Sequence, residues 1–147
     1  MTSVRALRRE DLEAVLPLVA GYQRFYGAEP DDERNRAFFR RFIAPSDQGL
    51  LLGAWEGDEL IGFATIYWTH SSTRAADVAL MNDLFVVPER RGTGAGRLLI
   101  EASAAAARDR GCVHLEWFTA TGNEVAQRLY ERMGAVRSAW FAYELLL

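Results

Sequence analysis

Three closely spaced glycines follow an apolar run in the segment VVPERRGTGAGRLL, residues 86–99, and this junction constrains the fold more than any other part of the chain. The β-rich run ends at Pro88, and the alanine-rich sequence after Gly94 favours a helix. Glycine inside a helix costs roughly 1 kcal/mol relative to alanine, so Gly92, Gly94 and Gly96 need a compensating role. A turn of this kind either packs the helix tightly onto a sheet or aims unpaired backbone N–H groups at an anion such as a phosphate.

The spacing and the composition exclude several classes of site. The dinucleotide fingerprint requires glycine where Arg97 stands, and the P-loop requires lysine followed by serine or threonine after its last glycine. All 17 basic residues are arginine, so Schiff-base chemistry on a lysine is excluded. The net charge of −3 argues against a nucleic-acid binder. His70 and His114 lie far apart without cysteine or carboxylate at ligand spacing, so no metal site is predicted.

The periodicity of apolar residues predicts a single α/β (α+β) domain over residues 1–147, without linkers or repeats. Strands are expected over 3–7, on both sides of a turn at 56–58 within 51–70, and over 76–88, 112–118 and 136–147. Helices are expected over 9–27, 30–45, 94–110 and 121–135. The early strands are adjacent hairpins, whereas strand, helix and strand from 76 to 118 imply one right-handed parallel crossover. The sheet is therefore expected to be mixed and mostly antiparallel, with about four helices.

Two motifs together indicate a family. Residues 91–96, Arg-Gly-Thr-Gly-Ala-Gly, match the Arg/Gln-x-x-Gly-x-Gly/Ala pyrophosphate loop of the GCN5-related N-acetyltransferases, and GNEVAQRLYERMGA, residues 122–135, resembles their second motif, Asn-x-x-Ala-x-x-Leu-Tyr-x-x-x-Gly. The resemblance covers nearly the full chain. Within the superfamily the chain is most similar to the diamine acetyltransferases and to the yeast histone and D-amino-acid acetyltransferases. It departs from the diamine group at Asn82, where that group carries a catalytic glutamate.

The resemblance implies a fold with splayed fourth and fifth strands and acetyl-CoA as cofactor. The pyrophosphate would take backbone N–H groups of the glycine loop, and the pantetheine arm would pair with the backbone of the preceding strand. The second motif would lie along the same arm. The cofactor residues implied in this way are Leu84, Phe85, Val86, Arg91, Gly92, Thr93, Gly94, Ala95, Gly96, Arg97, Asn123 and Ala126.

Acetyl transfer to an amine requires two proton transfers. An alkyl ammonium with a pKa near 10.4 is neutral to only about one part in two thousand at pH 7, so a base or a water chain ending on a carboxylate must help. Asp83 is the candidate base because it is the one acidic residue inside an apolar strand beside the acetyl-binding segment. The resemblance makes Tyr130 the general acid for the CoA thiolate. A backbone N–H near Phe85 or Val86 would stabilise the oxyanion of the tetrahedral intermediate.

The acceptor is predicted less specifically. Phe25 and Tyr26 lie between the first two predicted helices, close to several acidic residues, and aromatic and acidic groups suit a cationic amine. These aromatic residues are candidate substrate contacts, with core packing and helix capping as the alternative. The prediction is an acetyl-CoA-dependent transfer to a primary amine of a small molecule, such as a polyamine or an amino acid. The alternatives are a protein (lysine or N-terminal) acetyltransferase, a non-catalytic acyl-CoA-binding protein and a nucleotide-binding module.

Two further expectations concern the setting of the protein. The resemblance implies a homodimer. The acidic residues that interrupt the first apolar stretch exclude a signal peptide, no stretch approaches the roughly 20 apolar residues of a membrane span, and Cys112 has no partner for an internal disulfide. A cytoplasmic location, with no membrane partner, is therefore expected.

Overall fold

The computed structural model describes all 147 residues, in two units that comprise Met1–Trp117 and Phe118–Leu147. The first unit contains five strands and three helices, which are β1 (Thr2–Ala6), α1 (Leu12–Phe25), α2 (Asp32–Phe39), β2 (Gly49–Glu56), β3 (Glu59–Ser71), β4 (Ala76–Val86), α3 (Ala95–Asp109) and β5 (Leu115–Glu116). Short 3-10 turns cover Arg9–Asp11, Arg40–Phe42 and Pro88–Arg90. The second unit contains one helix, α4 (Glu124–Arg132).

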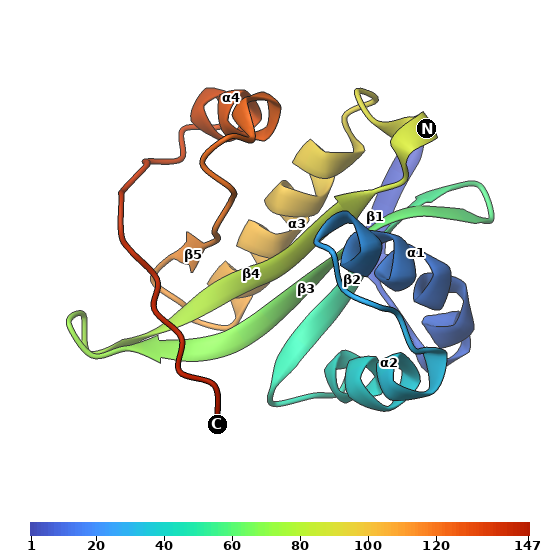
Figure 1. Cartoon of the computed structure of the whole chain (residues 1–147), viewed down its shortest axis with the longest axis horizontal. Coiled ribbons are helices and arrows are strands. Elements are labelled where there is room, and N and C mark those ends of the chain that lie inside the picture. Colours follow the sequence, from blue (N-terminus) through green and yellow to red (C-terminus); the bar gives the residue numbers. More distant parts are fainter. The chain divides into compact units, whose positions relative to one another are not determined.

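The sheet of the first unit has the strand order β1-β2-β3-β4-β5 (Figure 1). The first four strands are antiparallel to their neighbours, and β5 is parallel to β4. β5 pairs with β4 only at Ala79 and Leu80, so from Met81 to Val86 β4 has no strand partner on that side. This confirms the mixed sheet with splayed fourth and fifth strands, and it leaves a free backbone edge immediately before the glycine loop.

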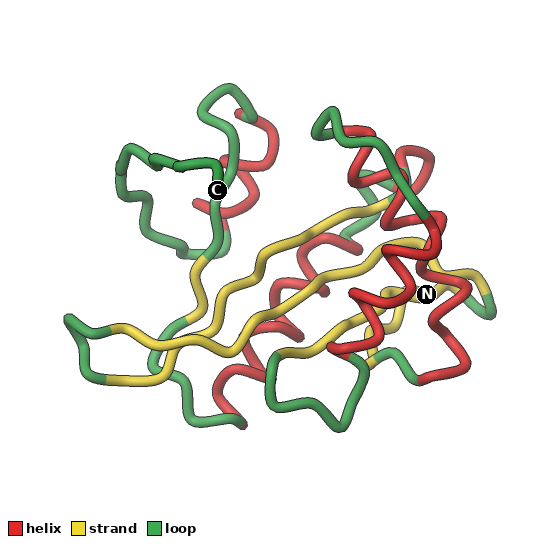
Figure 2. The backbone as a smooth tube through the Cα atoms, turned by 60° about the horizontal axis from the view of Figure 1, so that its bottom comes forward, coloured by secondary structure: helices red, strands yellow, loops and turns green.

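The helices of the first unit cover both faces of the sheet, α1 and α2 on one face and α3 on the other (Figure 2). Alternation along β3 explains the two layers, because Phe63 packs into the core with α1 and α2, whereas the position of a Cβ at Gly62 lies 3.3 Å from Leu99 of α3. The core on the α1 and α2 side is one cluster of buried residues: Leu7, Leu12, Val15, Leu18, Val19, Phe39, Phe42, Ile43, Leu51, Leu60, Phe63 and Phe85.

Three expected elements differ from the structure. The helix predicted over 30–45 ends at Phe39 and continues as a 3-10 turn to Phe42, and the strand predicted over 112–118 is reduced to Leu115–Glu116. The strand predicted over 136–147 is wrong, because these residues have no regular secondary structure. Their apolar side chains are exposed, and no neighbouring strand pairs with their backbone, which a strand requires. No helix has the length and apolar character that crossing a membrane would require.

Candidate active site

The glycine loop after β4 is shaped by backbone conformation rather than by packing. Gly92 and Gly94 have φ angles of 78° and 93°, in the left-handed region that side chains disfavour. No heavy atom lies within 4 Å of the position that a Cβ would take at either residue. Close packing therefore does not explain Gly92 and Gly94, and the space beside them is open.

The N-terminus of α3 follows the loop without any local compensation of its positive end. Gly94 is the N-cap residue and offers no side chain to the free N–H groups, and the first turn contains no acidic residue. The helix is 15 residues long, so its dipole adds to the attraction of these N–H groups for an anion. The predicted residues Ala95, Gly96 and Arg97 open this helix. The donor set fits a pyrophosphate.

Two of the three arginines around the loop are neutralised by neighbouring acids. The Arg90 side chain contacts carboxylate oxygens of Glu56 at 3.5 Å and Glu59 at 3.0 Å, on the β2–β3 hairpin. Arg97 Nε donates to Glu101 at 2.8 Å along α3. Their charges are therefore partly cancelled before any phosphate binds.

Arg91 differs from them because it forms no ion pair. Its Nε donates to the carbonyl of Val86 at 2.9 Å. The backbone N–H of Val87 donates to Ile61 of β3 at 2.9 Å, so by alternation the N–H and C=O groups of Val86 and Leu84 face the free edge of β4, whereas those of Phe85 face β3. The structure thus brings together Arg91, the free edge and the glycine loop, and it favours Val86 over Phe85 as the exposed N–H donor.

Asp83 is a buried carboxylate without a cationic partner. Its side chain is 3% exposed and lies across from Thr65 of β3, at a bulge in which Asn82 has no partner on β3. Asn82 Nδ2 donates to Asp83 Oδ1 at 3.0 Å. Burial raises the pKa of Asp83, and the neighbouring Thr65, Tyr22 and Asn82 side chains oppose this rise. Thr65 Oγ1 itself makes no hydrogen bond of normal geometry.

Two tyrosines next to Asp83 were not among the predicted site residues. The Tyr22 hydroxyl on α1 donates to the Asn82 carbonyl at 3.4 Å, and burial together with the charge of Asp83 raises the pKa of Tyr22. The same two causes raise the pKa of Tyr67 on β3 to about 12. Tyr22 belongs to the same aromatic and acidic segment as Phe25 and Tyr26, which the sequence indicates for the acceptor. For Tyr67, the signal in the sequence is its spacing of two residues from Thr65, which places both on one face of β3.

The predicted substrate contacts lie at the end of α1. Phe25 and Tyr26 are 62% and 57% exposed, and the Tyr26 ring lies 4.9 Å from that of Tyr22. Among the acidic residues that follow, Asp31 accepts a hydrogen bond from the backbone N–H of Arg34 and caps α2. The aromatic residues are therefore exposed next to the Asp83 neighbourhood, while Asp31 has the capping role that was the alternative interpretation.

The remaining predicted residues belong to the second unit. Asn123 is the N-cap of α4, and its side chain accepts a hydrogen bond from the Ala126 N–H at 3.4 Å. Tyr130 follows two helical turns after Asn123, and the spacing places the three residues on one face of α4. Within its own unit the second motif thus forms the helix that the sequence predicts.

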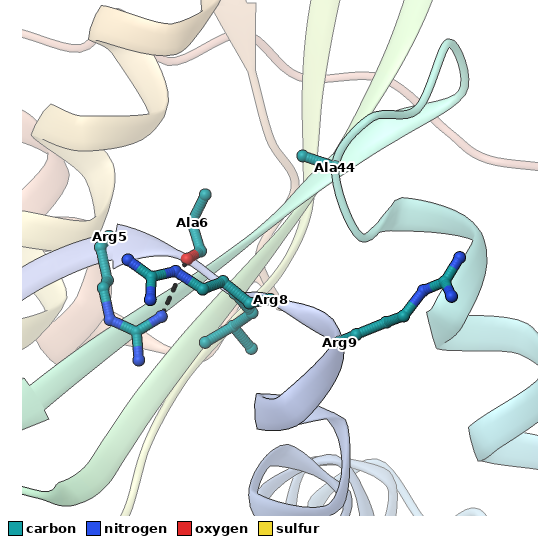
Figure 3. A pocket seen from close by; sticks show the side chains of 6 residues that line it. Arg5, Ala6, Arg8, Arg9 and Ala44 are labelled. Carbon is teal, nitrogen blue, oxygen red and sulfur yellow. Dashed lines mark hydrogen bonds between the residues drawn. The ribbon is translucent and has the colours of Figure 1, made fainter.

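A cavity of about 370 Å³ lies elsewhere on the first unit (Figure 3). It is at the β1 edge of the sheet, three strands from β4, and contains none of the predicted site residues. Arg5 within it donates to the carbonyl of Ala6, and Arg9 points away from Arg5 (Figure 3). The residues around it are Arg5, Ala6, Leu7, Arg8, Arg9 and Ala44.

Comparison with known proteins agrees with this geometry. A model described as the acetyltransferase (GNAT) family matches residues 13–135. An uncharacterized N-acetyltransferase of Bacillus subtilis, YhfO, is 33% identical over 144 residues, which are 98% of this chain and 96% of that protein. The D-amino-acid N-acetyltransferase HPA3 of Saccharomyces cerevisiae is 35% identical, covering 88% and 82% of the two chains. A solved structure described as a probable acetyltransferase superposes with a TM-score of 0.86 at 27% identity, covering 99% and 97%.

Proposed function

Because this chain belongs to the GNAT acetyltransferase family and uses acetyl-CoA, we propose that it acetylates a primary amine of a small molecule with Asp83 as the general base. The observation that carries the proposal is the buried Asp83 carboxylate without a counterion, beside the free edge of β4. A buried carboxylate whose pKa is raised by burial is typical of functional sites. Bound acetyl-CoA supplies an activated acyl group as a thioester.

Different residues would bind the different parts of the cofactor. The N–H groups from Gly92 to Arg97 and the Arg91 side chain would hold the pyrophosphate. The backbone groups of Leu84 and the N–H of Val86 would bind the pantetheine arm, and the resemblance assigns Asn123 and Ala126 to the same arm. The Val86 N–H faces the free edge, so it is the group that would stabilise negative charge on the acyl oxygen.

Asp83 and Tyr130 would handle the protons. A carboxylate with a raised pKa is a better base than an ordinary one and is still ionised at neutral pH when the rise is modest. The Asn82 amide donates to Asp83, and the Tyr22 hydroxyl donates to the neighbouring Asn82 carbonyl, so both side chains help to hold Asp83 in place. Tyr130 Oη would supply the proton that the departing sulfur needs.

Two observations support a small acceptor. Asp83 is almost completely buried next to Tyr22, so only a small group could come close to its carboxylate. The similar yeast protein is named a D-amino-acid N-acetyltransferase. Asn82 stands in place of the glutamate expected for diamine acetyltransferases, which favours an amino-acid-like amine over a polyamine.

A panel of acceptors tests the proposal directly. The purified protein is given acetyl-CoA with D- and L-amino acids, diamines, aminoglycosides, or lysine-containing and free-N-terminal peptides, and released CoA thiol is measured. We expect release with at least one small amine and none with peptides. Release with peptides alone would establish the protein acetyltransferase instead, and no release with any acceptor would support a non-catalytic acyl-CoA-binding protein.

A pair of loop variants tests the cofactor site. Gly94→Ala forces a side chain into a left-handed conformation, which costs about 1–2 kcal/mol, and should weaken CoA binding at least tenfold. Gly96→Ala lies inside α3 and matches the family pattern, which accepts alanine there, so CoA binding should persist. Calorimetric titration with CoA measures both. Equal affinities in the two variants would contradict the role of the turn.

The oligomeric state and the cellular location remain predictions. We propose that the enzyme acts as a homodimer in the cytoplasm. Sedimentation at micromolar concentration should give twice the mass of the 147-residue chain. A monomer under conditions that support activity would contradict the dimer.

A further inference from the structure

Arg91 has an unusual environment for a loop arginine. Its guanidinium carbon lies 5.4 Å from the ring centre of Phe85 and 5.9 Å from that of Phe25, while its Nε donates to the Val86 carbonyl. It has no acidic partner. Two aromatic rings and one carbonyl group therefore determine its position, and its positive charge stays available to an anion.

The first of the two rings is firmly fixed. Phe85 is 8% exposed and contacts the rings of Tyr22 and Phe63 at 6.4 and 6.2 Å. α1 approaches it closely because residue 21 is glycine, where a Cβ would come within 3.1 Å of the Phe85 ring. Phe85 thus connects β4 to the α1 helix that carries Tyr22.

The second ring is exposed and close to the acceptor side. Phe25 is the last residue of α1 and touches Tyr26 at 5.1 Å in an edge-to-face contact. A ring that is 62% exposed contributes little to the core. Core packing therefore does not explain why the Phe25 ring lies next to Arg91, whereas a contact that positions Arg91 does.

We propose that Phe25 and Phe85 act as a pair of positioning residues for Arg91, and that Arg91 thereby links the cofactor loop to the end of α1. An exposed arginine loses considerable side-chain entropy when it binds a phosphate, and the two rings reduce that loss by restricting it beforehand. Coupling of this kind is reciprocal, so cofactor binding also stabilises the end of α1. The inference rests on the use of CoA and on no particular acceptor.

Binding of CoA to single and double variants tests the positioning pair. Phe25→Leu removes the exposed ring, and a cation–π contact at such a site corresponds to a factor of about 2–5 in the dissociation constant. Arg91→Gln keeps a residue that the family pattern accepts but has no charge to place over a ring. We expect Phe25→Leu to weaken CoA binding about 2–5-fold in the native background and to have no further effect in the Arg91→Gln background.

Two controls accompany the titrations. Phe25→Tyr keeps an aromatic face and should restore native affinity. Phe38→Leu removes a similar contact elsewhere, where Arg41 lies 5.2 Å from the Phe38 ring, and should leave CoA affinity unchanged. Equal losses from Phe25→Leu in both backgrounds would mean that Phe25 acts without Arg91, and no loss in either would remove it from the site. Both results would overturn the proposal.

Hydrogen exchange tests the link to α1 without any acceptor. Addition of CoA should slow amide exchange over residues 20–28 of the native protein by at least threefold. The same addition to Arg91→Gln, at a CoA concentration that saturates it, should leave those amides unchanged. Unchanged exchange in the native protein would overturn the coupling, whatever the acceptor panel shows about the amine.

Discussion

Two aspartates of the first unit are buried to a similar degree but have opposite electrostatic environments. Asp11, after β1, is 6% exposed, and Asp83, on β4, is 3% exposed. Asp11 accepts from Arg5 at 2.6 and 3.0 Å and from the Arg8 N–H at 2.7 Å, and the Arg5 hydrogen bonds lower its pKa in spite of burial. Asp83 has only neutral donors around it, and burial raises its pKa.

The difference separates a structural carboxylate from a reactive one. The hydrogen bonds of Asp11 are used within the fold, where they fix the turn from β1 into α1. Asp83 has no counterion in the interior, so its ionised form costs stability. A buried charge that the fold does not compensate is explained by a reaction that needs it.

The largest effect expected from this comparison is on turnover. Asp83→Asn keeps the shape but removes the base, so kcat should fall by about 10²–10⁴-fold. Asp11→Asn should leave kcat per folded molecule unchanged. Thiol release with the best amine, at saturating acetyl-CoA, measures both. Similar activities for the two variants would contradict the assignment of Asp83, and CoA titration of Asp83→Asn checks that the cofactor still binds.

The sequence predicts the end of β4, the glycine turn and the start of α3 because these features are local. The glycines, the strand end and the helix start lie within residues 86–99, and the conformation of Gly94 depends on its immediate neighbours. The second motif likewise predicts α4 and its Asn123 cap. Predictions that depend on distant partners fail. The strand expected over residues 136–147 does not form, because no other strand pairs with it.

The Asp83 neighbourhood is set by distant contacts, and the sequence therefore predicts only its carboxylate. The register near the β3–β4 turn pairs Tyr67 with Leu80, and without interruption it would pair Ala64 with Asp83. Asp83 would then face α3. The bulge at Asn82 shifts the register by one residue and turns Asp83 toward Thr65 and α1. No local pattern in the strand predicts this bulge.

The two aspartates should also differ in their effect on stability. Asp11→Asn leaves the Arg5 guanidinium and the Arg8 N–H with a weaker acceptor, so the free energy of unfolding should fall by about 1–3 kcal/mol at pH 7. Arg5 is 39% exposed, which keeps the loss below that of a fully buried ion pair. Asp83→Asn removes an uncompensated charge and should not lower stability. Urea unfolding measures both, and a larger loss for Asp83→Asn would show that its charge is structural.

The pH dependence of stability should have opposite signs for the two sites. The folded pKa of Asp11 is lowered, so its contribution is full above the unfolded pKa of about 3.9 and disappears as the pH falls through the folded value. The folded pKa of Asp83 is raised, so its destabilising effect develops as the pH rises from about 4 through that value. Unfolding free energies of native protein and variants from pH 3 to 8 test this. Equal unfolding free energies of the native protein and Asp11→Asn at neutral pH would contradict this prediction.

The smallest effect concerns the hydroxyl of Tyr22. It lies next to Asp83 as the Arg5 guanidinium lies next to Asp11, but it is neutral. The Tyr22 hydroxyl lowers the pKa of Asp83, so Tyr22→Phe should raise that pKa and move the acidic limb of the kcat/KM profile to higher pH. The ring contacts with Phe63 and Phe85 remain, and stability at pH 7 should change by less than about 1 kcal/mol. We expect the loss of kcat/KM to be largest at the acidic end of the profile and to become smaller as the pH rises and Asp83 ionises. Tyr26→Phe, which keeps the neighbouring ring, is the control. An unshifted limb in Tyr22→Phe would mean that Asp83 ionises independently of Tyr22, or that another group is the base.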